Sequence, residues 1–132
     1  MNTKSVGEKS EGMVLARFLQ KGWVVLTPFG DNQRYDLVID RGNGFERVQV
    51  KTGSIENGCV IFNACSSTAH RKNGGRRDYR GQADFFASYC PTNEKIYLIG
   101  VSKVGRKQVS LRIDPPKNKQ THSIMWAKDF EI

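Results

Sequence analysis

Three polar residues with the chemistry of phosphodiester hydrolysis lie within a short stretch of the sequence. Asp36 opens one alternating segment, residues 36–40, and Gln49 and Lys51 lie on the next, residues 45–52. A carboxylate and an amide carbonyl supply oxygen ligands for a hard divalent cation, which polarises a phosphate and lowers the pKa of a bound water. A lysine beside them orients or deprotonates that water and screens the developing negative charge.

A hairpin is expected to bring these residues together. Asn43-Gly44 favours a tight turn, so residues 36–40 and 45–52 should pair antiparallel. A four-residue loop sets Asp36 opposite Gln49, whereas a two-residue loop sets it opposite Lys51. Side chains alternate along a strand, so both registers place the three residues on one face. The opposite face is apolar and comprises Leu37, Ile39, Val48 and Val50.

Glu11 is the expected fourth member of the site. Residues 5–21 predict a helix that ends at Gly22, with Thr3 or Ser5 as its N-cap. Glu11 falls within the apolar stripe of that helix, where an unpaired carboxylate is costly, so we expect it to serve a metal directly or through a water. The stripe consists of Val14, Leu15, Phe18 and Leu19.

A purely structural interpretation of the same polar residues is the alternative. Asp at a strand start and Lys on an exposed strand face are common for solvation alone. Glu8, at the edge of the helical stripe, is expected to cap or solvate the first turn, where the helix dipole favours acids. Whether Glu8 assists Glu11 stays open.

The rest of the chain reads as rich in strands. Apolar and aromatic runs predict strands over residues 23–27, 59–64, 83–89, 95–101 and 108–113. Residues 66–81 are polar, basic and glycine-bearing, which indicates a loop, and residues 123–130 indicate a short terminal helix. The apolar residues of that helix are expected either at an oligomer interface or in the core; they are Ile124, Met125, Trp126 and Phe130.

A basic segment points to a polyanionic partner. The 132 residues carry 21 Lys and Arg against 13 Asp and Glu, a formal net charge of +8. Five cations of the predicted loop are candidate DNA contacts, and they are Arg71, Lys72, Arg76, Arg77 and Arg80. Arginine can read guanine edges bidentately, so base readout is expected there. A solvated loop without DNA contacts is the alternative.

Cysteine and histidine do not indicate a metal centre. Three cysteines cannot all pair within one chain, and neither they nor the two histidines have the spacing of a zinc site. Cys59, Cys65 and Cys90 are therefore expected to be reduced and packed in the core. No stretch is apolar enough to cross a membrane, and residues 1–9 lack the apolar run of a signal peptide. We expect a cytoplasmic protein, associated with the nucleoid when it binds DNA.

These motifs resemble those of the PD-(D/E)XK nucleases. An acid on the first helix, an aspartate opening one hairpin strand and an (E/Q)-x-K on the next correspond to Glu11, Asp36 and Gln49-Val50-Lys51. Residues 28–38, 48–53, 83–91 and 124–127 are similar to the subgroup encoded by group I introns, so the resemblance covers nearly the whole chain. It implies one nuclease domain over residues 1–132 with an α/β, restriction-endonuclease-like core, a mixed sheet flanked by helices.

The resemblance also implies an activity. It implies a homing endonuclease that makes a double-strand break in a long DNA target with Mg²⁺ as cofactor and Mn²⁺ as its substitute. It implies a homo-oligomer as well, and a 132-residue subunit spans too little duplex to specify a rare site, which favours a dimer or a tetramer. Glutamine at position 49, where most of the superfamily has an acid, is normal in the intron subgroup. It lowers the charge of the site and leaves the number of metals open.

Two other functions fit these residues. A Holliday-junction resolvase would use the same active-site chemistry but recognise branched DNA by its shape, and it would prefer a four-way junction to any linear duplex. A non-catalytic DNA-binding module on a nuclease scaffold would bind DNA without cutting it. No membrane and no organic cofactor are expected.

Overall fold

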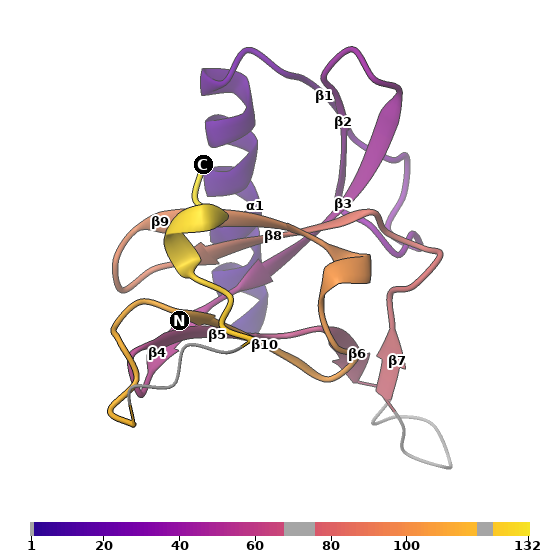
Figure 1. The fold of residues 1–132 in the computed structure, drawn as a ribbon. Coiled ribbons are helices and arrows are strands. Elements are labelled where there is room, and N and C mark those ends of the chain that lie inside the picture. Colours follow the sequence, from indigo (N-terminus) through magenta and orange to yellow (C-terminus); the bar gives the residue numbers. More distant parts are fainter. Residues whose placement is uncertain (1, 68–75, 119–122) are drawn as a thin grey trace.

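The computed structural model describes residues 2–67, 76–118 and 123–132 (Figure 1). These residues form one α-helix, ten strands and two 3₁₀ turns. The elements are α1 (Thr3–Gln20), β1 (Val24–Leu26), β2 (Leu37–Asp40), β3 (Phe45–Thr52), β4 (Ser54–Glu56), β5 (Cys59–Asn63), β6 (Cys65–Ser67), β7 (Arg76–Asp78), β8 (Phe85–Cys90), β9 (Lys95–Gly100), η1 (Val101–Lys103), β10 (Gln108–Arg112) and η2 (Ala127–Asp129).

The central sheet is mixed, as the resemblance to the PD-(D/E)XK nucleases implies. Its strand order is β1-β2-β3-β8-β9, with β3 and β8 parallel and the other neighbours antiparallel. A second sheet has the order β10-β5-β4, and β6 pairs with β7 as a two-stranded ribbon. The excursion through these smaller sheets returns the chain to the central sheet as β8, which makes the parallel pairing possible.

The β2–β3 hairpin has the four-residue loop. Asp40 pairs with Phe45 and Leu37 with Val48, which sets the residue before β2, Asp36, opposite Gln49. Within the loop, Gly42 and Gly44 have φ of 97° and 99°, values that a residue with a Cβ rarely adopts. The first of the two predicted registers is therefore confirmed.

Helix α1 covers one face of the central sheet. Its buried residues are Ser10, Val14 and Phe18, and the two apolar ones pack against the sheet residues predicted to share a face, Leu37, Ile39, Val48 and Val50. Gly22 follows the helix with φ of 80°, and this confirms the predicted stop.

Two details of the helix differ from the prediction. The N-cap is Asn2, whose side chain accepts a hydrogen bond from the Ser5 backbone N–H at 2.8 Å, rather than Thr3 or Ser5. Leu19 is 57% exposed, and the stripe instead begins at Ser10, whose hydroxyl lies 2.6 Å from the Thr52 hydroxyl. A polar residue fits the buried face there because a strand hydroxyl satisfies it.

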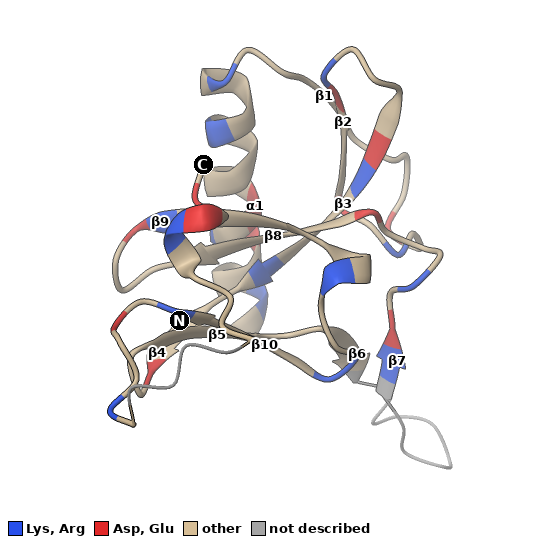
Figure 2. Cartoon of the chain, in the orientation of Figure 1, with Lys and Arg blue, Asp and Glu red and all other residues tan. Residues whose placement is uncertain are grey.

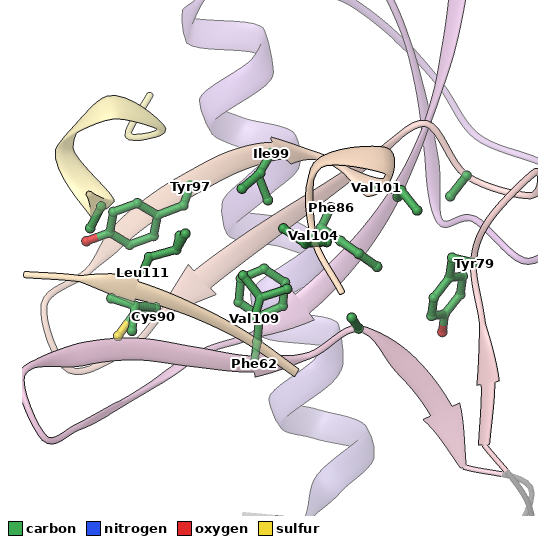
Figure 3. Close-up of a cluster of buried hydrophobic side chains, with 14 residues drawn as sticks. Phe62, Tyr79, Phe86, Cys90, Tyr97, Ile99, Val101, Val104, Val109 and Leu111 are labelled. Carbon is green, nitrogen blue, oxygen red and sulfur yellow. The ribbon is translucent and has the colours of Figure 1, made fainter. Parts of the chain in front are cut away.

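Strands β5 and β10 cover the other face of the central sheet. The buried cluster between them includes Phe62, Phe86, Val109 and Leu111 (Figure 3). Cys59, Cys65 and Cys90 are all free and buried, which agrees with their predicted role in packing.

Two segments correct the sequence-based predictions. The segment 66–81, expected to be a loop, contributes strands β6 and β7, and only residues 68–75 of it fall outside the described ranges. The segment 123–130, expected to be a helix, holds only the 3₁₀ turn η2, because Trp126 pairs as an extended residue with Arg112. Met125 and Phe130 pack against the core.

None of the described helices is long and apolar enough to span a membrane.

Candidate active site

Asp36 lies just before β2, where the chain enters the central sheet. Its backbone N–H donates to the Val48 carbonyl at 2.9 Å, and its Oδ2 accepts a hydrogen bond from the Val50 N–H at 3.0 Å. If β2 began earlier in the chain, a backbone carbonyl of β2 would accept the Val50 N–H. The Asp36 carboxylate accepts it instead. Because the Val50 N–H points along the plane of the sheet, this contact holds the carboxylate beside the start of β2, between the two faces of the sheet.

Gln49 and Lys51 follow on β3, on the face opposite the apolar residues that pack on α1. The Gln49 side-chain amide donates to the Val50 carbonyl at 3.4 Å, which leaves its Oε1 as an acceptor. The Lys51 Nζ donates to the Cys65 carbonyl and to the Tyr79 hydroxyl, both at 3.2 Å. These contacts hold the ammonium group near the base of the β6–β7 ribbon.

Glu11 approaches Asp36 from the helix. The two carboxylates line one cavity of about 240 Å³. Its remaining wall comes from the connection between β1 and β2 and comprises Thr27, Pro28, Gly30, Asp31, Gln33 and Tyr35. The structure therefore brings Glu11 and Asp36 together, although α1 and the predicted polar face of the hairpin lie on opposite sides of the sheet.

The pKa values of the two carboxyl groups are both raised by burial, and that of Glu11 is raised in part by the charge of Asp36. Burial raises the pKa of Glu11 above its usual value, and the charges of Asp36 and Glu8 raise it further. Burial also raises the pKa of Asp36, against the opposing effects of the Val50 N–H and the Lys51 charge. Asp36 thus interacts with Glu11 on one side and with Lys51 on the other.

The donor set fits a hard divalent cation. Two carboxylates and an amide carbonyl are oxygen ligands, and a cation would offset the repulsion between the two acids. Among residues 2–67, 76–118 and 123–132, no three His, Cys, Asp or Glu side chains are grouped as a metal site. The expected third ligand, Gln49, is not of these residue types, and neither it nor Lys51 lines the cavity that Glu11 and Asp36 share.

Arg34 and Tyr79 contact the candidate site but were not predicted to belong to it. The Arg34 guanidinium lies 4.0 Å above the centre of the Tyr79 ring, and Tyr79 contacts Lys51. Arg34 donates to Gln82 Oε1 at 2.8 Å and to the Asp78 carbonyl at 2.6 Å. The one available hint is position, since Arg34 precedes Asp36 by two residues.

The predicted DNA contacts are placed only in part. Arg71 and Lys72 lie outside the described residues, as does the side chain of Arg76. Arg77 is exposed on β7, whereas the guanidinium of Arg80 donates to the Val104 carbonyl at 2.7 Å and so supports the fold as well. Basic residues also lie on α1, β3 and η1, so positive charge is spread over several elements (Figure 2).

Comparisons with known proteins agree with this geometry. The family model "PD-(D/E)XK endonuclease" matches residues 1–132. Among solved structures, the bacterial homing endonuclease I-Ssp6803I has a TM-score of 0.79 and 26% sequence identity, over 99% of this chain and 89% of that one. No curated protein sequence matches. The resemblance inferred from the motifs is confirmed, and the chain belongs to the PD-(D/E)XK endonuclease family.

Proposed function

We propose that this nuclease is a site-specific endonuclease of the homing type, which hydrolyses phosphodiester bonds in double-stranded DNA with Mg²⁺. The observation that carries the proposal is the position of the Asp36 carboxylate at the start of β2, between Glu11 of the helix and Lys51 of β3. The likeness to a homing endonuclease over nearly all of the chain supports the homing type.

Each side chain has a distinct part in the proposed reaction. Asp36, Glu11 and the Gln49 carbonyl would hold the cation, with Glu11 acting directly or through a water. When bound there, Mg²⁺ would supply polarisation of the phosphate and a more acidic water. Lys51 orients the attacking water and stabilises the negative charge that develops on the phosphate oxygens. Mn²⁺ should substitute for Mg²⁺, because both accept octahedral oxygen ligands.

DNA binding and assembly complete the proposal. We assign phosphate and base contacts to the basic segment that contains Arg71, Lys72, Arg76, Arg77 and Arg80. One active site cuts one strand, so a double-strand break needs two sites, and we propose a homo-oligomer, either a dimer or a tetramer.

The test is a cleavage assay on a mixed pool of DNA. The purified protein is incubated with linear duplexes and four-way junctions, with and without Mg²⁺, and the ends produced are mapped. Cleavage of a linear duplex at one site, only with Mg²⁺, is expected. Preferential cleavage of junctions would instead identify a resolvase, and binding without any cleavage would identify a non-catalytic DNA-binding module.

Variants with matched controls test the assigned residues. Asp36→Asn and Lys51→Ala should abolish cleavage while leaving duplex affinity in Ca²⁺ within about twofold, since they act in the chemical step. The controls are Asp40→Asn, at the other end of β2, and Lys95→Ala, on the far edge strand, where Lys95 pairs with Glu131 at 3.2 Å. Equal loss in a control and its test variant would refute the assignment.

A further inference from the structure

Tyr79 is a buried tyrosine whose hydroxyl reaches the proposed catalytic lysine. It follows β7 directly and is 4% exposed. Its ring packs edge-on against Phe86, with centroids 5.5 Å apart and planes at 89°. In Figure 3 it stands at the margin of the buried cluster, apart from the group around Phe62 and Val109. The ring is fixed by the core, so the hydroxyl position is fixed as well.

The Lys51 ammonium group is held at this margin. It has three N–H donors, and two of them point to the Cys65 carbonyl and to the Tyr79 hydroxyl, each at 3.2 Å. The Nζ also lies 4.7 Å from the Tyr79 ring centre, within range of a cation–π contact. Cys65 opens β6 and Tyr79 follows β7, so both anchors belong to the base of the same ribbon.

Arg34 fixes that ribbon in turn. Its guanidinium donates to the Ser66 hydroxyl and to the Arg77 and Asp78 carbonyls, the last two at 3.2 and 2.6 Å. It also lies over the Tyr79 ring at 4.0 Å. Because Arg34 is only two residues before Asp36, one side chain connects the metal-binding end of β2 to the ribbon that anchors Lys51.

We propose that Tyr79 and Arg34 are positioning residues of the nuclease site. Tyr79 orients the Lys51 ammonium so that its third N–H faces the phosphate or the attacking water, and Arg34 holds Tyr79 and its ribbon against the Asp36 strand. The inference rests on the proposed function of Lys51. A lysine side chain has four flexible torsions, so fixing its head lowers the entropic cost of reaching the reactive geometry.

The first test is Tyr79→Phe, with Tyr97→Phe as its matched control. Tyr97 is 1% exposed, and its hydroxyl accepts a hydrogen bond from Asn93 at 2.9 Å, so each substitution removes one buried hydroxyl and one hydrogen bond. Both variants should lose similar thermal stability. Single-turnover cleavage of the duplex that the parent cuts should slow about three- to tenfold for Tyr79→Phe alone, the range for one lost hydrogen bond. Affinity for that duplex in Ca²⁺ should not change.

A second readout does not depend on cleavage. The Nζ resonance of ¹⁵N-labelled Lys51, identified by its loss in Lys51→Arg, should shift and exchange faster with water in Tyr79→Phe and in Arg34→Lys, but not in Tyr97→Phe. Arg34→Lys keeps the charge but loses the planar fork that reaches several acceptors at once, so its cleavage should also slow.

The outcomes separate the two proposals. If the parent protein cuts no DNA, the proposed function fails. If the parent cuts and Tyr79→Phe cuts at the parental rate, or leaves the Lys51 resonance in place, the positioning role fails while the proposed function stands.

Discussion

Replacing Glu11 by glutamine should separate the contribution of this carboxylate to folding from its contribution to catalysis. Burial raises the pKa of Glu11, and Asp36 and Glu8 raise it further, so the folded chain holds the proton more tightly than the unfolded chain. Stability from this group is therefore full below the unfolded-state pKa and is lost as the pH rises through the folded-state pKa. Above the folded-state pKa the ionised carboxylate destabilises the metal-free fold.

The expected gain from Glu11→Gln is small because the side chain is only half-buried and water screens its charge. We expect about 0.5 to 1 kcal/mol at pH 7, the scale of a partly exposed charge interaction. For a chain of this size that corresponds to a rise of about 2 to 4 °C in Tm. The difference between variant and parent should vanish below the unfolded-state pKa and grow as the pH rises to 7.

Thermal melts in EDTA at several pH values measure this difference. Added Mg²⁺ should stabilise the parent more than the variant, because a ligand that binds only the folded state stabilises it by an amount that grows with the logarithm of its concentration over Kd. Cleavage should fall about 10- to 100-fold, as for the loss of a group that supports a metal, while duplex affinity in Ca²⁺ stays within about twofold. Glu8→Gln is the control: the exposed Glu8 should change both readouts less.

Either of two results would refute the reasoning about Glu11. A variant that melts below the parent at neutral pH without metal would show that the carboxylate supports the fold. A variant that cleaves at the parental rate would place Glu11 outside the chemistry.

Other predictions concern packing and DNA contact. Gly53→Ala should lower the free energy of unfolding by about 1 to 3 kcal/mol in urea titrations, because its Cβ would lie 2.8 Å from Ser88 Oγ and 3.0 Å from Val60 Cγ1. Gly12→Ala, with nothing within 4 Å of the added Cβ, should instead raise it by about 0.5 to 1 kcal/mol, and a loss there would mean that the helix face is covered. Ser88→Ala should be neutral or stabilising by about 1 kcal/mol, since the Ser88 hydroxyl is buried without a hydrogen-bond partner among the described residues; a clear loss would point to such a partner. Arg77→Ala should weaken duplex binding and reduce the slope of log K against log salt by about one, and an unchanged slope would remove Arg77 from the interface.

The predictable part of the site is the part that local pairing dictates. Asp36, Gln49 and Lys51 lie on one hairpin, and the alternation of side chains predicts one face for all three in either register considered. Gln49 and Lys51 share a face of β3, whereas Asp36 precedes β2 and its carboxylate lies between the two faces. Which register forms depends on the loop length, and the observed Asp40–Phe45 pair corresponds to the four-residue loop. Glu11 was predictable for another reason: a carboxylate within an apolar stripe needs a partner.

The unpredicted part depends on contacts between distant segments. The strands of the β6–β7 ribbon are short and polar, so no apolar alternation marks them in the sequence. Two of the Arg34 acceptors are backbone carbonyls, which every residue type has, so nothing in the sequence identifies them. Likewise the apolar pattern of residues 123–130 fits a helix, but pairing of Trp126 with Arg112 satisfies its backbone in extended form.

The location of the candidate site follows from where β2 begins. Had β2 extended by two more residues, a backbone carbonyl would have paired with the Val50 N–H, and the carboxylate of Asp36 would have faced one side of the sheet only. The connection through Pro28 and Gly30, where Gly30 has φ of 85°, instead brings the chain beside Glu11 and leaves the strand end open. Asp36 can thus face groups on both sides of the sheet. The hairpin register sets position 49 opposite Asp36, so a third carboxylate there would add like charge near Asp36, whose pKa burial already raises. In the proposed site, the Gln49 amide would supply an oxygen ligand without that repulsion.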